Sequence, residues 1–277
     1  DAFAAIANGG IYTKPVFFTQ ILDHSGKVLL ENEPETKRVL KDSTAFLLTD
    51  AMAQSMESSR MFASSGVSLN STSAVANIPG MSNAGKSGTT TSNNDIWFVG
   101  FTPYYTAGIW SGCDDNQKIS AIGSSTSYHK KIWKKIMTTI HEGLADTGFP
   151  VPSSVTTAQI CRKSGKLAIP GVCDHDPRGS AVYTEYFAKG TVPTEVCDHH
   201  VQLTVCSESG GLATEYCPEK TTRTFMVIPE GESGGTDDSK YRSPGTCTIH
   251  GSSSVVVPSD ETSDENSSSQ AETTQET

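Results

Sequence analysis

The residues with the clearest chemical potential lie in one short run, residues 85–90, which reads Gly-Lys-Ser-Gly-Thr-Thr. The run combines a cation, several hydroxyls and a glycine that leaves room for a ligand against the backbone. Counted from Gly80, it also matches the phosphate-binding pattern G-x-x-x-x-G-K-[ST]. Such a loop must leave a buried strand and open a helix, whose amides hold the phosphate. Here Pro79 interrupts the preceding residues and β-branched threonines follow, so the run predicts a strand, and nucleotide binding is disfavoured.

The run also has the form Lys-Ser/Thr-Gly, and further motifs flank it on both sides. Residues 4–10 read AAIANGG upstream, residues 97–103 read WFVGFTP, and residues 109–112 read IWSG. With these co-linear motifs, residues 1–148 resemble the end of the transpeptidase domain of class A penicillin-binding proteins, the bifunctional peptidoglycan synthases. The family more often has Thr at the position of Ser87, and the serine keeps the hydroxyl.

This resemblance implies acyl transfer from peptides that end in D-alanyl-D-alanine. Such chemistry needs a cation near the reacting groups and an amide donor for the tetrahedral oxyanion. By resemblance, Lys86 and Thr89 are the catalytic residues, with the Thr89 amide in the oxyanion hole. The expected substrate-binding residues are Ser87, Gly88, Thr89 and Thr90. The simpler alternative is a Gly/Ser/Thr-rich loop, which the flanking motifs make less attractive.

The nucleophile of the family is the serine of an S-x-x-K motif, which precedes an S-x-N motif and then the lysine triplet. Residues 127–130 fit S-x-x-K but follow the triplet, so their order is wrong. Residues 68–70 and 92–94 fit S-x-N but lie too close to Lys86. We therefore expect the true motifs upstream of Asp1 and expect this chain to be inactive alone. The resemblance also implies an upstream glycosyltransferase and a membrane anchor, which would place the protein at the extracellular face of the cell membrane.

Composition narrows the classes of partner. The net charge of −10 argues against nucleic acid, and no apolar run is long enough for a membrane span. The resemblance implies peptidoglycan stem peptides, a lipid-linked precursor, β-lactams and other cell-wall synthesis proteins as partners. It implies no cofactor for transpeptidation.

The elements that must position the run predict an α+β fold, an antiparallel sheet with packed helices as in the penicillin-binding/serine β-lactamase-like transpeptidases. We expect a hairpin over 14–31, a helix capped by Asp42 or Ser43, and two strands over 95–102 and 105–111. A final helix should pack one apolar face on the sheet, formed by Ile132, Trp133, Ile136, Met137 and Ile140. We expect Trp97 and Trp110 in the core, and we expect surface or packing roles for His129 and His141.

Beyond residue 148 the composition changes, and six of the seven cysteines form an imperfect repeat. Each copy has the pattern C-x-x-S-G-x-L-A, then a second cysteine, then C-x-x-H. The second copy carries a Gly/Asp/Ser-rich insertion near residues 231–239. The two sets are Cys161, Cys173, Cys197 with His200, and Cys206, Cys217, Cys247 with His250. Modules this small usually need a covalent or metal staple.

Two staples remain possible. Three cysteines and one histidine form a complete tetrahedral zinc set, whereas an exported protein normally forms disulfides, so disulfides are somewhat favoured. We expect Cys113 to be a small buried hydrophobe. The expected division is transpeptidase 1–148, repeats 149–203 and 204–250, and a disordered acidic Ser/Thr-rich tail 251–277. A non-catalytic cell-wall or partner-binding role, built on the repeats, is the alternative function.

Overall fold

The computed structural model describes residues 1–62, 67–119, 127–234 and 238–251. The chain divides into two compact units, one made of Asp1–Gln202 with Thr224–Ser243 and the other of Leu203–Arg223 with Pro244–Thr277. The division into four predicted segments remains a prediction. The tail was predicted to be disordered over 251–277, and residues 252–277 of it lie outside the described residues.

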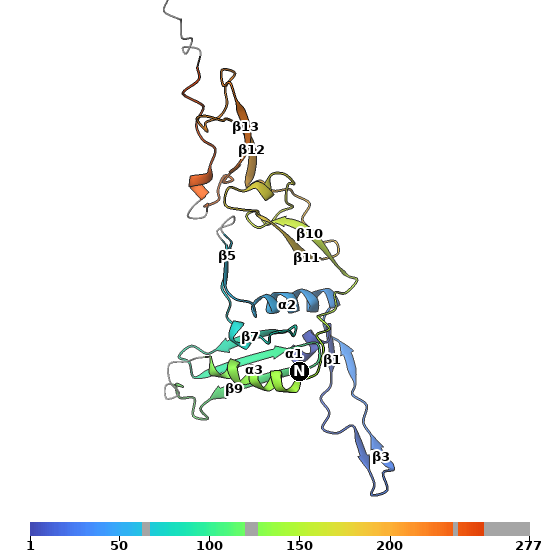
Figure 1. Ribbon diagram of the computed structural model, residues 1–277. Helices are drawn as coiled ribbons and strands as arrows, with labels where there is room; N and C mark the ends of the chain where they lie inside the picture. Colours follow the sequence, from blue (N-terminus) through green and yellow to red (C-terminus); the bar gives the residue numbers. More distant parts are fainter. Residues whose placement is uncertain (63–66, 120–126, 235–237, 252–277) are drawn as a thin grey trace, which may run out of the picture. The chain divides into compact units, whose positions relative to one another are not determined.

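A three-stranded antiparallel sheet forms the centre of the first unit, in the order β7-β8-β9 (Figure 1). Its strands are β7 (Ala84–Thr89), β8 (Asp95–Phe101) and β9 (Thr106–Gly112). The sequence prediction of the last two strands is confirmed to within one residue at each end. The Lys86 run therefore forms a strand at the edge of this sheet, as expected, and β8 is the central strand.

Helix α3 (Tyr128–Ile140) lies against β8 and β9 on one face of the sheet (Figure 1). Trp133 is fully buried there and meets Phe98 edge-to-face, with ring centroids 5.1 Å apart. Gly100 is needed beneath this contact, because a Cβ there would lie 2.7 Å from Cζ2 of Trp133. The expected apolar face is only half right. Trp133 and Met137 are buried, whereas Ile132, Ile136 and Ile140 are exposed, because the described part of the chain places no element over them.

Helices α1 (Ala2–Ala7) and α2 (Asp42–Gln54) provide a second apolar cluster, in which Met52 packs with Ala84 and Phe101. Helix α2 lies against β7, so it supports the edge strand directly. Its N-cap is Lys41 rather than the predicted Asp42 or Ser43. Asp42 is instead held by hydrogen bonds from the Ser43 amide at 2.7 Å and the Ser154 hydroxyl at 2.7 Å.

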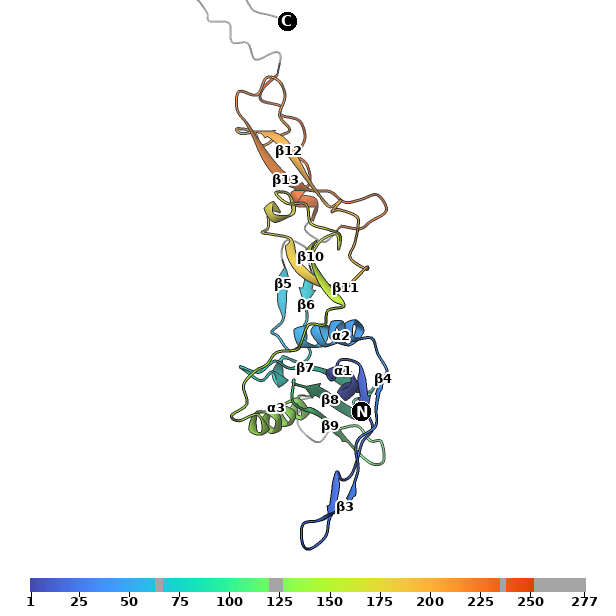
Figure 2. The ribbon, with the colours of Figure 1, turned by 90° about the vertical axis from the view of Figure 1, so that its right-hand side faces the viewer.

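The predicted hairpin over 14–31 forms between β2 (Gln20–Leu22) and β3 (Val28–Glu31). It extends a longer two-stranded ribbon whose base pairs β1 (Ile11–Thr13) with β4 (Thr36–Arg38) (Figure 2). The side chain of Asp23 fixes the turn by accepting hydrogen bonds from the amides of Ser25 and Lys27. Another short ribbon pairs β5 (Arg60–Phe62) with β6 (Val67–Leu69).

Four individual expectations had different outcomes. Trp97 and Trp110 are not core residues: they face each other across β8 and β9 and are 46% and 44% exposed. Cys113 is exposed, not buried, because it follows the last residue of β9. His141 is a packing residue, as expected, and its ring lies 2.7 Å from the Thr102 hydroxyl. His129, in the first turn of α3, is also buried in the packing.

The cysteine repeats are built on two-stranded ribbons that the sequence did not reveal. Strand β10 (Val155–Cys161) pairs with β11 (Val182–Ala188), and β12 (His200–Cys206) pairs with β13 (Lys220–Met226). Short 3-10 helices occur at Ala74–Ala76, Cys173–His175 and Asp238–Tyr241. Among the described residues, no helix has the length and apolarity needed to cross a membrane.

Candidate functional site

The predicted catalytic run lies along the outer edge of the central sheet. Its first residues, Ala84 and Gly85, are buried, whereas Lys86, Gly88 and Thr89 are exposed. The edge is therefore anchored at one end in the core and open to a ligand at the other.

The direction of the backbone groups on β7 follows from its hydrogen bonds. The Gly85 carbonyl points away from β8, because it accepts from the Ser55 hydroxyl at 3.0 Å. The Thr90 amide points toward β8, because it donates to the Asp95 carbonyl at 3.1 Å. Successive residues of an antiparallel strand alternate between these two directions. The amide of Thr89 therefore points outward, which is the direction an oxyanion-hole donor requires.

The side chains of the run divide into two groups. Lys86 extends along the edge, and its Nζ donates to the Ser87 carbonyl at 2.8 Å. Thr90 does not join the others, because its hydroxyl accepts from the Asp95 amide at 2.8 Å and closes the turn between β7 and β8. The structure thus brings Lys86, Ser87, Gly88 and Thr89 together on one edge, while Thr90 has a structural contact.

Gly88 lies opposite Trp97 in the register of β7 and β8. A Cβ at this position would lie 3.5 Å from the Trp97 Cβ, an ordinary van der Waals distance. The fold therefore does not demand glycine here. A ligand lying against the strand would explain it.

The cysteine repeats form two further sites, because each set of four predicted residues converges. In the first, Cys161, Cys173, Cys197 and His200 are all buried, and their potential ligand atoms lie within 4.8 Å of one another. Cys206, Cys217, Cys247 and His250 form the equivalent second cluster. All six cysteines are free thiols. The stronger expectation, disulfides between the first two cysteines of each copy, is therefore wrong for this structure, and the zinc alternative has the geometry it required.

The distances within each cluster fit a tetrahedral metal centre. His200 Nδ1 lies 3.5 Å from Cys161 Sγ and 3.3 Å from Cys197 Sγ. His250 Nδ1 lies 3.4 Å from Cys206 Sγ and 3.5 Å from Cys247 Sγ. A zinc ion bound at usual Zn–S and Zn–N lengths would separate sulfur and nitrogen by about 3.6 Å.

The backbone around the two clusters repeats as well. Each leading cysteine ends a strand and enters a turn closed by a glycine, Gly165 or Gly210, at φ +71 or +72. The sulfur of the second cysteine in each copy accepts a hydrogen bond from a backbone amide at 3.3 Å. The donor is Ile169 for Cys173 and Thr214 for Cys217. The repeat in sequence is therefore a repeat in structure.

In each cluster, hydrogen bonds to neighbouring groups favour a thiolate. Hydrogen bonds with Cys173 and Cys197 lower the pKa of Cys161, and the same sharing raises the pKa of Cys173. In the second cluster, the Ser209 hydroxyl lowers the pKa of Cys247 to about 6. The thiolate is the form that binds a metal.

Comparison with known proteins assigns the family. Residues 1–138 match the family model "Penicillin binding protein transpeptidase domain", and residues 151–202 match "Penicillin-binding protein 1A, C-terminal domain". The chain belongs to the penicillin-binding proteins. Penicillin-binding protein 1A of Clostridium botulinum (strain Langeland) is 35% identical over 237 residues, which cover 86% of this chain and 27% of the relative. Penicillin-binding protein 2D of Bacillus subtilis (strain 168) is 34% identical over 202 residues, covering 71% and 26%.

The fold agrees with this family. The crystal structure of penicillin-binding protein 1A from Haemophilus influenzae superposes with a TM-score of 0.56 at 23% identity, covering 70% of this chain and 32% of that one. This chain therefore has the penicillin-binding transpeptidase fold in its sheet and helices. It spans about a quarter of the length of the curated relatives named above.

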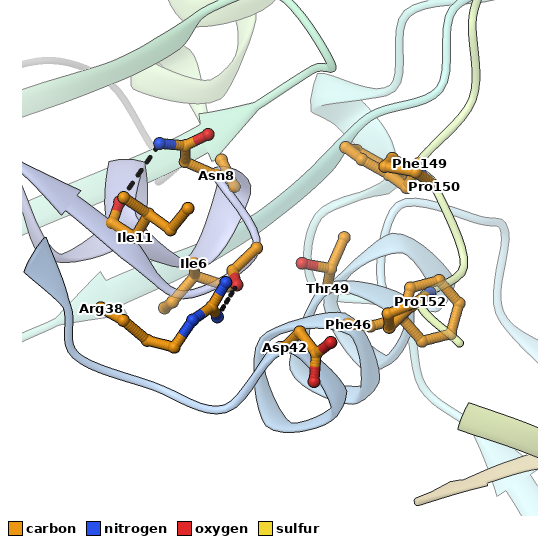
Figure 3. A pocket seen from close by; sticks show the side chains of 12 residues that line it. Ile6, Asn8, Ile11, Arg38, Asp42, Phe46, Thr49, Phe149, Pro150 and Pro152 are labelled. Atoms are coloured by element: carbon orange, nitrogen blue, oxygen red, sulfur yellow. Dashed lines mark hydrogen bonds between the residues drawn. The ribbon is translucent and has the colours of Figure 1, made fainter. Parts of the chain in front are cut away.

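A pocket of about 260 Å³ lies apart from the Lys86 edge, between α1, α2 and the segment that leads to the first repeat (Figure 3). Its lining is mainly apolar, with Phe46, Phe149 and Pro152 around it. The Arg38 guanidinium beside it donates to the Gly9 carbonyl at 2.9 Å. The pocket contains none of the predicted site residues.

Sequence reasoning missed the residues that surround the first cysteine cluster. Asp176 Oδ2 lies 2.8 Å from His200 Nε2, and both side chains are fully buried. Burial alone would lower the pKa of His200, but its bonds with Asp176 and the thiols outweigh this and raise the pKa to about 11. Asp176 follows Cys173 by three residues, yet the second repeat has Lys220 at that position, so the repeat pattern gave no signal for it.

Proposed function

We propose that this chain supplies one wall of a serine D,D-transpeptidase site that cross-links peptidoglycan and reacts with penicillin. The observation that carries the proposal is residues 86–89 of the edge strand β7, which combine an exposed lysine with an outward amide within a match to the transpeptidase family. The names of the relatives, penicillin-binding proteins, support β-lactams as ligands.

In this proposal the roles follow from position on the strand. The Lys86 ammonium stabilises negative charge beside the nucleophile, and the Thr89 amide stabilises the oxyanion of the tetrahedral intermediate. The hydroxyls of Ser87 and Thr89 bind the terminal carboxylate of the stem peptide or the β-lactam. Gly88 lets the ligand backbone lie against the strand.

The nucleophilic serine, by the motif order of the family, belongs to a part of the protein outside these 277 residues. An upstream glycosyltransferase that uses a lipid-linked precursor, an anchor, and a place at the extracellular face of the membrane complete the proposal. The limited share of each relative that the chain spans is consistent with such additional parts.

Labelling with fluorescent penicillin tests this function. The complete protein should be labelled on a serine outside these 277 residues, and this chain alone should not be labelled. Covalent label mapped to Ser127 or another serine of this chain would overturn the proposal. A complete protein that takes no label would favour the non-catalytic cell-wall or partner-binding role instead.

We further propose that each cysteine cluster binds one zinc ion, because three sulfurs and one imidazole nitrogen converge within 4.8 Å in both. Thiolate and imidazole are ligands that zinc prefers, and a closed four-ligand set is typical of structural sites. Here the protein residues orient the set: the strand ends place Cys161 and Cys206, and backbone amides hold the second cysteines. Elemental analysis should find two zinc ions per chain, and thiol counting after denaturation should find seven free thiols. Disulfides in place of zinc would contradict this proposal and leave the transpeptidase proposal intact.

A further inference from the structure

The insertion in the second repeat packs against the first repeat. The stretch between the second and third cysteines is six residues longer in the second copy than in the first. Residues Thr224–Ser243, which include this insertion, belong to the compact unit of the first cluster and not to the unit of their own repeat. The extra residues therefore serve the first cluster.

Asp238 is one described residue through which the insertion contacts the first repeat. It is fully buried, and its carboxylate accepts from Arg178 Nη1 at 2.9 Å and also pairs with the Lys163 ammonium. Tyr241 adds a ring below the same guanidinium, whose Cζ lies 4.8 Å from the ring centroid. A single buried aspartate would be costly, so these partners are needed to hold it there.

From Asp238 the contacts continue to a predicted metal ligand. Arg178 grips Asp176 through Nη2 at 3.0 Å and Nε at 3.1 Å. Asp176 in turn bonds His200 Nε2 at 2.8 Å. A carboxylate on the far nitrogen of a ligating histidine fixes its tautomer and orientation, so that Nδ1 faces the metal. The insertion thus supports a carboxylate–histidine pair of the kind that strengthens metal binding.

The network is also balanced in charge. Asp176 and Asp238 carry two negative charges, and Lys163 and Arg178 carry two positive ones. All four side chains are at most 10% exposed. Since the charges of these four side chains cancel one another, they can remain in place behind His200.

In the second cluster, the carboxylate that pairs with the histidine is exposed to solvent. His250 Nε2 pairs with Glu208 Oε2 at 3.2 Å, but the Glu208 side chain is 70% exposed. The His250 side chain is itself 18% exposed, whereas that of His200 is fully buried. An exposed pair of this kind is screened by water and holds its histidine weakly.

We propose that the two zinc sites differ in kind: Asp238 clamps Asp176 behind His200 and makes the first site tight and slow to exchange, whereas the second exchanges zinc readily with the medium. This inference rests on the proposed zinc binding. It assigns the insertion a role as the outer support of the first site, and it leaves the second site as one that can gain or lose Zn²⁺.

Zinc transfer from the full chain to a chromogenic chelator tests the proposal. Two phases of equal amplitude are expected, and Cys206→Ser should remove the fast one. Asp238→Asn should accelerate the slow phase by about 10-fold or more, the size of effect seen when outer-shell partners are lost. Asp238→Glu keeps the carboxylate, so the rate of its slow phase should lie between those of Asp238→Asn and the wild type. The matched control, Glu208→Gln at the second site, should leave the slow phase unchanged.

Replacing zinc with cobalt gives a spectroscopic test, because the cobalt spectrum would not change if Asp238 only stabilised the fold. In Asp238→Asn the cobalt absorption bands of the first site should shift in position while keeping the intensity of tetrahedral thiolate coordination. Should that variant fail to fold, Lys163→Gln removes one partner of Asp238 without touching Asp176 and should also accelerate the slow phase.

The failures are distinguishable. A chain that binds no zinc would refute the zinc proposal, and this inference with it. Two zinc ions that leave in one phase, or a slow phase unaffected by Asp238→Asn and by Lys163→Gln, would overturn this inference alone.

Discussion

Replacing Lys86 with alanine should separate chemistry from folding. Its side chain is exposed on the edge strand, and its ammonium bonds the carbonyl of the neighbouring Ser87 at 2.8 Å. Truncation leaves no buried group unpaired, so the free energy of unfolding should change by no more than about 0.5 kcal/mol.

The effect on acylation should be much larger. Removing one pre-organised group that stabilises transition-state charge costs about 10²–10³-fold in rate, or about 2.7–4 kcal/mol. In the complete protein, the second-order rate constant for labelling by fluorescent penicillin should fall by at least that factor. Lys86→Arg keeps the charge but changes its shape, and an intermediate rate is expected.

The assay pairs this rate with the thermal midpoint of the same protein. The matched control is Lys135→Ala, which removes an exposed lysine of α3 that has no proposed role. The labelling rate and the thermal midpoint of this variant should both stay at the wild-type value. Near-normal labelling of Lys86→Ala would remove Lys86 from the mechanism. A large drop in its thermal midpoint would show that the lysine has a structural role.

Two further outcomes are expected. Gly100→Ala puts a Cβ 2.7 Å from Trp133 and should destabilise the sheet by about 1–3 kcal/mol. The temperature at which half of the penicillin labelling is lost should therefore fall. The control Gly108→Ala, whose Cβ would lie at an ordinary 3.5 Å from Val99, should not lower that temperature. Equal midpoints for the two variants would contradict the packing described. Removal of zinc by a strong chelator should make residues 151–250 sensitive to protease, because such small modules depend on their staple; penicillin labelling should persist, and its loss in step with zinc would show that the repeats and the reactive site are not independent.

The sequence predicted the elements whose signals are local. The strands over 95–102 and 105–111 were predicted from β-branched and aromatic runs broken at Pro103, and they form with those bounds to within one residue. The edge strand was predicted from glycine and threonines that disfavour a helix. Both cysteine sets were predicted from their spacing, and the four residues of each set converge in a cluster of their own.

The errors concern what lies next to an element in space. Periodicity showed which residues of α3 share a face, but it could not show that the described sheet covers Trp133 and leaves Ile132 exposed. Trp97 and Trp110 were assigned to the core because aromatic side chains are usually buried, but both are exposed. That tendency does not show which face of the sheet is covered.

The support of the first cluster was beyond sequence reasoning for a similar reason. Asp238 follows Asp176 by 62 positions and belongs to the other repeat. Only the fold brings it to Arg178. The preference for disulfides likewise came from compartment and not from geometry, and convergence of four ligand atoms is information that only coordinates contain.

The most direct test of the transpeptidase account is a structure of the complete protein acylated by penicillin. The account predicts that the acyl carbonyl oxygen lies within about 3.1 Å of the Thr89 amide, at hydrogen-bond distance. It also predicts that the penicillin carboxylate contacts the hydroxyls of Ser87 and Thr89, with Lys86 beside the acylated serine. An acyl group bound elsewhere, with the strand Ala84–Thr89 free of contact, would contradict it.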